Sequence, residues 1–383
     1  MLAKDELLQT YQSETINLLR FPMAVLVILI HTDWYYASWQ TDINLMSGEG
    51  LCFLLGYIFR VLAEISVPTF FIFSGFLFFN NFREFTWNGY KKKLESRFNT
   101  LVIPYIMWNV LVYVFGIIGK VWDVASNGAS WDVVTSFLIK NNIRFLWDIN
   151  HWGDTNRLWM WWTAYSTGPI DSPLWFLRDL IVVTILSPLI YWLVKRTKGF
   201  VVLILLLSYV SGFWVVWHGF GIEAFFFFTL GAYFAINKIN LVEFCQKNYG
   251  LFIILLTVCL GIEIFSWIPA DYMCIVRKLL YVSIIFSVIS IASYLVTKKR
   301  FRANQHLVAS CFFIYACHLA NLIITPVSAV YILVSVVISG DGYLEQFVRF
   351  ITVPIVTAAV LFFAYVMLMR FMPKVGRFFC GGR

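Results

Sequence analysis

The sequence predicts an all-α, polytopic membrane protein, a bundle of about ten transmembrane helices, and three observations lead to that fold class. Hydrophobic residues make up 60% of the 383 residues and charged residues 13%, against about 45–50% and about 25% in soluble domains. The apolar stretches are continuous rather than alternating, which is typical of membrane helices and not of a membrane β-barrel. The charged residues gather in short clusters between these stretches, as they do at the ends of membrane spans.

Ten stretches are long enough to cross a bilayer, which takes about 20 mostly apolar residues. Pro68 and Pro326 lie within the two longest stretches and favour a bend or a break there. The predicted spans are 15–36, 51–79, 99–119, 173–194, 200–217, 223–237, 250–268, 275–296, 308–337 and 350–370.

The placement of Lys and Arg predicts that both termini are cytoplasmic. With the N-terminus inside, the cytoplasmic segments carry most of the basic residues, and an odd number of spans would mix the two groups. The net charge of +8 therefore reflects membrane orientation, and no nucleic-acid partner is expected. The outer segments hold only Lys120, Lys140, Arg144, Arg157 and Arg349.

We expect a single membrane domain over residues 1–383. Its long outer segment, 120–172, contains an amphipathic stretch (131–140) and a tryptophan-rich run, and is expected to form an interfacial cap. The first apolar stretch is too long for the core of a cleavable signal peptide, so a retained signal anchor is expected. The cysteines show no metal-ligand spacing, which predicts free thiols and no metal site, with a Cys52–Cys274 bridge as an open alternative.

Basic residues inside the predicted spans need an explanation, because a charge at mid-bilayer costs about 2.5–3.5 kcal/mol on insertion scales. Arg60 and Glu64 are one helical turn apart and can pair with each other. Arg277 and Lys278 lie close enough to an outer end to extend their charges toward water. The full set is Arg20, Arg60, Arg178, Arg277 and Lys278.

Arg20 and His31 form a separate pattern in the first predicted span. They are eleven residues apart, which is three helical turns plus about 20°, so both project from the same face with a rise of about 16 Å between them. One basic group therefore lies near the cytoplasmic mouth and an imidazole lies well across the membrane. A packing histidine that is hydrogen-bonded to a neighbouring helix is the structural alternative for His31.

Five segments, in order and spacing, resemble motifs of the acyltransferase-3 family of membrane acyltransferases. Arg20 and His31 match the basic-x10-His motif of the family's first span. The others are Val67–Phe76 (V-P-x-F-F-x-x-S-G-[FY]), the basic loop from Lys93 and Arg97 into Pro104-Tyr105, the W-F-L start of the fourth span in Pro173–Leu177, and S-x-x-x-I-Y-x-x-H in Ser310–His318.

Two features depart from the family pattern. Relatives often carry Arg-x-x-x-Arg before the third span, whereas this chain has Lys93-x-x-x-Arg97, which keeps the charge and loses one planar guanidinium fork. Many relatives also carry a C-terminal secreted hydrolase-like domain. Here the chain ends about a dozen residues after the last predicted span, so a stand-alone membrane module is expected.

The resemblance implies transfer of an acyl group, usually acetyl, from cytoplasmic acyl-CoA to a hydroxyl of a surface polysaccharide or another exported acceptor. It further implies a multi-pass protein of the bacterial cytoplasmic (inner) membrane, with acyl-CoA as a donor substrate and no permanently bound cofactor. In this interpretation Arg20 holds a phosphate or pantetheine oxygen, and His31 takes the acceptor's proton as a general base. A covalent acyl-imidazole on His31 is an alternative route.

Further residues are candidates for the donor and acceptor sites. The cytoplasmic cluster of Lys92, Lys93 and Arg97 suits the phosphates of CoA, although the same charges also serve membrane topology. Four residues that could line the cavity, or serve packing alone, are Ser74, Trp175, Tyr315 and His318.

The aromatic residues of the outer segment have two interpretations, a sugar-binding cleft or an interfacial aromatic belt. They are Trp147, Trp152, Trp159, Trp161, Trp162 and Tyr165.

Two other classes of function remain open. A transporter or exporter of a glycan or acyl intermediate would use the polar interior as its path, but the internal repeats frequent in transporters are not seen. A structural partner of a glycan synthase would tolerate the loss of His31.

Overall fold

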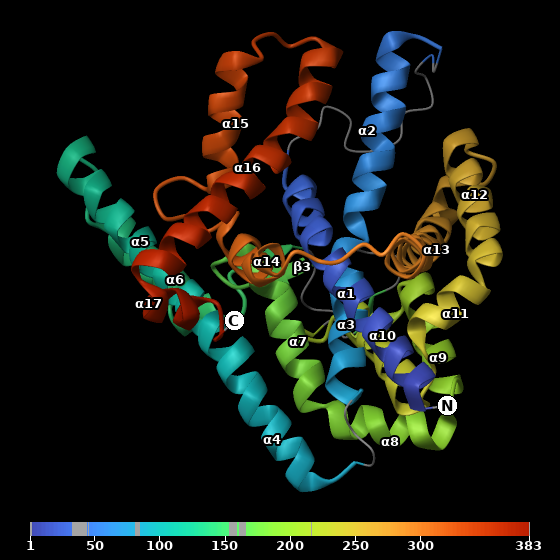
Figure 1. The fold of residues 1–383 in the computed structure, drawn as a ribbon. Helices are drawn as coiled ribbons and strands as arrows, with labels where there is room; N and C mark the ends of the chain where they lie inside the picture. Colours follow the sequence, from blue (N-terminus) through green and yellow to red (C-terminus); the bar gives the residue numbers. More distant parts are fainter. Residues whose placement is uncertain are drawn as a thin grey trace.

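The computed structural model is a bundle of helices with two short β-ribbons (Figure 1). The structure describes residues 2–32, 44, 46–80, 85–152, 159–160, 166–215 and 217–382. Its helices are long and apolar, and almost no strand is present. The predicted all-α polytopic membrane fold is confirmed.

The N-terminal half of the chain is largely helical. They are α1 (Leu2–Ile30), α2 (Gly48–Glu64), α3 (Ser66–Phe79), α4 (Trp87–Arg97), the π-helix η1 (Phe98–Val102), α5 (Ile103–Asn127), α6 (Asp132–Asn141), the 3-10 helices η2 (Ile143–Leu146) and η3 (Ser172–Leu174), α7 (Trp175–Ile185) and α8 (Ser187–Thr197).

The C-terminal half closes the bundle. Its helices are α9 (Phe200–Ser211), α10 (Ile222–Ile236), α11 (Leu241–Lys247), α12 (Tyr249–Phe265), α13 (Ala270–Thr297), α14 (Gln305–Cys317), α15 (Pro326–Val337), α16 (Tyr343–Phe371) and α17 (Pro373–Phe379).

The ten predicted spans all overlap helices, but the helices differ in length. Among the described residues, five are long and apolar enough to cross a membrane, and up to seven if the bent pairs α7–α8 and α10–α11 each count as one span. Helices α9, α12, α14 and α15 are apolar but shorter. Left-handed residues end two of them early, Gly212 (φ 72°) after α9 and Ser266 (φ 50°) after α12.

Prolines interrupt the spans where a helix cannot continue. Pro188 lies in the first turn of α8, and α7 and α8 meet there at 62°. The predicted break in the stretch 308–337 is confirmed, since α14 ends at Cys317 and α15 begins at Pro326. Thr325 caps the new helix, its hydroxyl accepting a hydrogen bond from the Ser328 amide. Proline lacks an amide hydrogen and is well tolerated only in a first helical turn.

Helix α1 lies at the centre of the bundle, where it contacts α2, α3, α13, α14 and α16 (Figure 1). Met23, Ala24, Val27 and Ile28 are all buried on it. Because an α-helix turns about 100° per residue, these four positions form one broad buried face, and Arg20 and His31 project from the same face. This face packs against the neighbouring helices, which places Arg20 and His31 on the side of α1 that faces the bundle.

Helices α3 and α10 cross at a backbone contact. A Cβ atom on Gly75 would lie 2.0 Å from the carbonyl oxygen of Phe228, and one on Gly231 would lie 2.0 Å from the carbonyl oxygen of Ile72. Only glycine permits such an approach, and small residues at helix crossings are typical of membrane bundles. The glycine of the S-G-F motif therefore has a packing role.

The outer segment 120–172 is built as expected in part. The amphipathic stretch forms α6, and two antiparallel ribbons not predicted from the sequence follow it, β1 (Asn150–Trp152) with β3 (Ser166–Gly168), and β2 (Trp159–Met160) with β4 (Trp214–Val215). Trp161, Trp162 and Tyr165 lie outside the described residues.

All seven cysteines are free thiols. The predicted free state is confirmed, and Cys52 and Cys274 do not form a bridge.

Replacing Gly75 by alanine is expected to destabilise the protein by at least about 1–3 kcal/mol, the usual cost of overpacking, because the added methyl meets a backbone carbonyl that cannot rotate away. The measurement is the unfolding temperature of the detergent-solubilised protein. Gly119→Ala is the matched control, since no atom lies within 4 Å of its Cβ position and alanine favours helix. Equal unfolding temperatures for the two variants would contradict this account of the α3–α10 crossing.

Candidate functional site

His31 directly follows the last residue of α1, and its backbone position is held on both sides. The Arg60 guanidinium of α2 donates a hydrogen bond to the carbonyl of Ile30. The Thr32 hydroxyl donates to the carbonyl of Ile28 at 3.1 Å. These bonds satisfy carbonyls that a helix end leaves without partners. They therefore fix the backbone position from which the His31 side chain projects.

The His31 ring lies against a second imidazole. The ring centroids of His31 and His318 are 5.3 Å apart, with the rings tilted by 39°. His318 is the residue that caps the C-terminal end of α14, and it is completely buried. The structure thus brings together two candidates that lie almost three hundred residues apart in the sequence.

Helices α1 and α14 contact each other. Arg20 interacts electrostatically with Cys311 of α14, and the ring of His31 contacts that of His318. Cys311 and His318 are seven residues apart, two turns of one helix face. The two helices therefore meet at two levels, one at Arg20 and one at His31.

The hydrogen bonding of His318 indicates its tautomer. Nδ1 lies 2.6 Å from the carbonyl oxygen of Tyr315. A carbonyl only accepts hydrogen bonds, so Nδ1 carries the proton in the neutral ring and Nε2 is left with a lone pair. Nε2 is buried and has no hydrogen-bond partner among the described residues. An imidazole with a free, buried acceptor nitrogen beside His31 is a polar group suited to holding a proton or a ligand atom.

His31 opens into a cavity of about 110 Å³ that also contains Trp175 and Tyr315. Three of the predicted site residues therefore share one space. Glu223 and Tyr281 were not predicted from the sequence as site residues. Glu64 was predicted only as a partner of Arg60. The whole lining is Val27, Ile30, His31, Glu64, Val67, Pro68, Pro173, Trp175, Glu223, Tyr281 and Tyr315.

The segment before α7 is held against α14 and buried with it. The Tyr315 hydroxyl donates to the carbonyl of Pro173, which places Trp175 at the cavity. Asp171 is buried, and its amide donates to the Asn109 side chain at 3.1 Å. Burial raises the pKa of the Asp171 carboxyl well above its ordinary value, because its charged form would lose hydration without gaining a partner.

Three cations lie together at the other end of this line. Lys93 and Arg97 of α4 both lie 6.0 Å from the ring centroid of Phe78. Arg97 also interacts electrostatically with Arg20 of α1. Residues 93 and 97 are one turn apart and share a face of α4. Lys92 points away from that face and is exposed.

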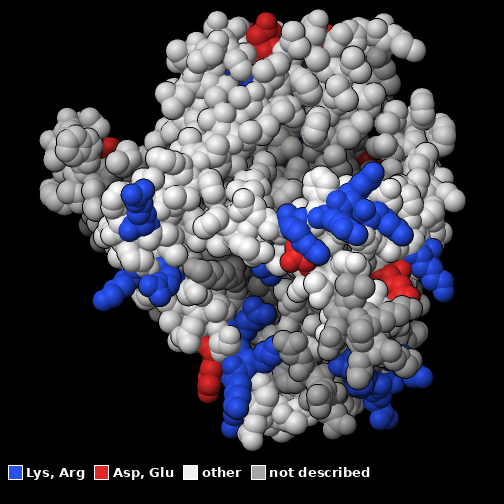
Figure 2. All heavy atoms as spheres, viewed as in Figure 1, with Lys and Arg blue, Asp and Glu red and all other residues white. Residues whose placement is uncertain are grey.

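Figure 2 shows Lys and Arg side chains along the edge of a hollow and within it, over the region of α4. No carboxylate among the described residues pairs with Arg20 or Arg97; the ion pairs found there involve other cations. Like charges that converge without a counter-ion are costly unless an anion joins them. The arrangement favours an anionic ligand at this end.

Ser74 is half-buried on α3 and is not among the residues that line the His31 cavity. The structure therefore does not place it in the His31 cavity. Its neighbour Gly75, at the crossing of α3 and α10, accounts for the motif at this position.

Other charges within the spans have partners in the interior. The predicted Arg60–Glu64 pair is confirmed at 3.3 Å. Arg277 reaches buried Glu263 at 2.9 Å, and Lys278 donates to the carbonyl of Tyr209 at 2.7 Å. The expectation that both extend toward water is wrong for Lys278 and incomplete for Arg277, because interior acceptors lie within reach.

Arg178 is held in a buried ion pair with its neighbour in sequence. Its guanidinium lies 2.9 Å from Asp179, and it donates to the carbonyl of Trp147 at 2.7 Å. Asp179 also accepts from the amide of Gly221 at 3.1 Å, directly before α10. This pair joins the outer segment, α7 and α10. The ring centroid of Trp147 also lies 5.6 Å from the guanidinium carbon of Arg178. Its roles in a sugar-binding cleft or an aromatic belt stay predictions.

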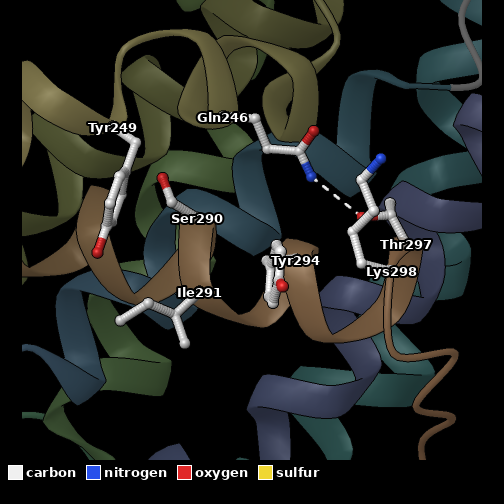
Figure 3. Close-up of a pocket in the computed structure, with 7 residues that line it drawn as sticks. All are labelled: Gln246, Tyr249, Ser290, Ile291, Tyr294, Thr297 and Lys298. Atoms are coloured by element: carbon white, nitrogen blue, oxygen red, sulfur yellow. Dashed lines mark hydrogen bonds between the residues drawn. The ribbon is translucent and has the colours of Figure 1, made fainter.

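A larger hollow lies elsewhere. Gln246, Tyr249, Tyr294 and Lys298 are among its lining residues, between α11, α12 and α13 (Figure 3). Gln246 donates to the hydroxyls of Ser293 and Thr297. None of the predicted site residues lies in it, and the candidate site is the His31 cavity with the cationic end of α1.

Comparison with known proteins agrees with this constellation. A family model described as an acyltransferase domain, that of the acyltransferase-3 family, matches residues 14–369. The chain belongs to this family.

One curated relative is the succinoglycan biosynthesis protein ExoH of Rhizobium meliloti (strain 1021), which is 27% identical over 198 residues. The match covers 51% of this chain and 47% of ExoH, so about half the length of each protein is compared. No solved structure matches the chain.

Replacing Asp179 by asparagine is expected to destabilise the protein by about 3–5 kcal/mol, because it leaves the Arg178 charge buried without its partner. Thermal unfolding in detergent measures the loss. Glu243→Gln is the control, since Glu243 is exposed on α11 and its removal strands no buried cation. If both variants unfold at the wild-type temperature, the ion pair does not stabilise the junction of α7 and α10.

Proposed function

We propose that this protein is a membrane O-acyltransferase that moves an acyl group, acetyl in the first instance, from cytoplasmic acyl-CoA to a hydroxyl of a surface polysaccharide or another exported acceptor. One observation carries the proposal: an imidazole pair at the C-terminal end of α1 and a converging set of cations at Arg20, three turns back along the same helix, inside a chain of the acyltransferase-3 family. In this proposal residues 1–383 act as one domain of the bacterial cytoplasmic membrane, with both termini cytoplasmic and segment 120–172 as an outer cap.

The donor belongs at the cationic end. CoA carries several phosphate charges, and guanidinium and ammonium groups bind phosphate by strong charge-assisted hydrogen bonds. Arg20, Lys93 and Arg97 supply them, with Lys92 at the exposed edge of α4 as a weaker contributor. The rise of about 16 Å from Arg20 to His31 is comparable to the length of the pantetheine arm, so the thioester reaches the imidazoles while the nucleotide stays at the mouth.

The transfer step is a general-base reaction at His31. The imidazole takes the proton of the acceptor hydroxyl as its oxygen attacks the thioester carbonyl. The carbon–sulfur bond then breaks, the ester remains on the acceptor, and the thiolate of CoA takes the proton back from the imidazolium. His318, its Nδ1–H on the carbonyl of Tyr315, presents a lone pair beside the His31 ring. Attack by His31 itself, with an acyl-imidazole intermediate, uses the same groups.

A polysaccharide acceptor is supported by the relative, whose name assigns it to succinoglycan biosynthesis. Trp175 and Tyr315 in the cavity add aromatic surface suited to a sugar ring. Comparing acetyl-CoA with succinyl-CoA as donors for the purified protein would decide which acyl group is transferred.

His31→Ala is expected to lower the turnover number about 100- to 10,000-fold, the usual contribution of a positioned general base. The assay follows radiolabelled acetyl transfer from acetyl-CoA to surface glycan in membranes that contain equal amounts of protein. His306→Gln, an exposed histidine at the start of α14, is the control and keeps wild-type turnover. Unchanged acylation in the His31 variant would exclude its role as base, whereas loss of glycan export together with acylation would favour a transporter.

Arg20→Ala and Arg97→Gln are each expected to raise the acetyl-CoA concentration at half-maximal rate about 10-fold or more, since a hydrogen bond to a charged group contributes about 1.5–3 kcal/mol. Direct binding of CoA to the purified variants, by isothermal titration, gives the same comparison without turnover. Lys92→Gln serves as control, because its side chain is exposed on another face of α4, and it should change binding less than 2-fold. Wild-type CoA affinity in the Arg20 and Arg97 variants would rule out this donor site.

A further inference from the structure

The polar and aromatic residues that line the His31 cavity fall into two chemical groups. The first is His31, directly after α1, with Trp175 of α7 and Tyr315 of α14. The second, which we call the acidic wall, is Glu64 of α2, Glu223 of α10 and Tyr281 of α13. Two carboxylates and a phenol from three separate helices thus meet in a space of about 110 Å³.

Each carboxylate has one cation near it and further hydrogen-bond acceptor positions on its oxygen atoms. Glu64 is paired with Arg60 at 3.3 Å, and its side chain is 35% exposed. Glu223 interacts electrostatically with Lys278, and also with Glu64 and Asp179. No hydrogen bond to the Glu223 side chain is found among the described residues, although Asp179 beside it is saturated by Arg178 and Gly221.

A carboxylate offers about four lone-pair positions and no donor. One cation leaves most of those positions open, and a carboxylate that faces a cavity is stabilised when hydrogen-bond donors fill them. The donors that fit are hydroxyl groups, which carry one hydrogen each and no charge of their own. The acidic wall therefore has the chemistry of a polyol-binding surface.

The same wall disfavours the donor. Two carboxylates repel the phosphates of CoA, and with effective dielectric constants near 20 such repulsion reaches kilocalories at contact distances. The cations that attract those phosphates lie around Arg20, three turns from His31 along α1. The two substrates are thus separated by charge along one helix, with His31 at their meeting point.

The size of the cavity limits what enters it. Pockets that enclose a whole drug-sized ligand measure about 300–1,000 Å³, and this one is about 110 Å³. It accommodates the reacting edge of a ring with one or two hydroxyls, while the remainder of the acceptor stays outside.

We propose that Glu223, with Glu64 and Tyr281, binds the hydroxyls that flank the reacting one and so positions the acceptor for His31. This inference rests on the proposed acyl transfer and adds the residues that select the acceptor. Glu223 and Tyr281 are positioning residues in this scheme, because the proton leaves through His31 and the acyl carbon never contacts them.

The test uses the purified full chain in lipid nanodiscs, with acetyl-CoA as donor and surface glycan from cells that lack this gene as the unmodified acceptor. Glu223→Gln keeps the shape of the side chain and removes its charge. We expect the glycan concentration at half-maximal rate to rise about 10-fold, while the acetyl-CoA concentration at half-maximal rate and the slow hydrolysis of acetyl-CoA without glycan stay within 2-fold of wild type.

Tyr281→Phe is a second variant that removes only a hydroxyl, and it should shift the glycan dependence in the same direction. Glu243→Gln, whose carboxylate is exposed on α11, is the matched control. If Glu223→Gln does not fold, as judged by size-exclusion chromatography, Tyr281→Phe decides the question alone.

The outcomes separate the two proposals. Glycan dependence within 2-fold of wild type in the folded variants overturns the acceptor assignment and leaves the acyltransferase intact. A parallel rise in the acetyl-CoA requirement also overturns it, because the wall would then serve the donor. If the wild-type protein transfers no acetyl or succinyl group to the glycan, the proposed function itself fails, and the acceptor assignment fails with it.

Discussion

The side-by-side contact of α1 and α14 is the constraint on which the rest of the site depends. The shared face of the two helices is buried in the bundle, so a polar side chain there must find a partner or a cavity. His31 opens into the cavity, and His318 is hydrogen-bonded to the carbonyl of Tyr315 and lies against the His31 ring. Arg20, three turns below His31, lies close to the cations of α4. The spacing of Arg20 and His31 along α1 thus sets the distance from the cations to the imidazoles.

Charge divides the interior into zones that match the chemistry of two substrates. The cations of α1 and α4 converge around Arg20 and Phe78. The carboxylates of α2 and α10 face the cavity at His31, directly after the C-terminal end of α1. Buried pairs such as Arg178–Asp179 lie between the outer segment and the helices, where they join elements rather than line the cavity. The Arg178–Asp179 pair stabilises the fold. Glu223, which has free hydrogen-bond acceptor positions, faces a space that a ligand can fill.

The family motifs divide in the same way. Gly75 of the S-G-F motif lets α3 and α10 approach to backbone contact, and the Tyr315 hydroxyl holds the start of α7 at Pro173. Through these contacts Gly75 and Tyr315 hold in place the helices that carry the site. His31, Trp175 and Tyr315 reach the cavity only because those contacts hold their helices together. The motifs of this family therefore contain residues that pack helices together as well as residues that line the cavity.

The sequence by itself determined the membrane class, the helices, the break at Pro326, the Arg60–Glu64 pair and the common face of Arg20 and His31. All of these follow from composition or from the 3.6-residue period, which act within one segment. Tertiary structure decided that His318 meets His31, that Lys93 and Arg97 but not Lys92 turn inward, and that Lys278 finds an interior carbonyl. It also brought Glu64, Glu223 and Tyr281 to one cavity. A carboxylate at the first residue of the predicted span 223–237 was a signal for Glu223, but its destination was not, because the rotation and crossing of separate helices depend on contacts between faces far apart in the chain.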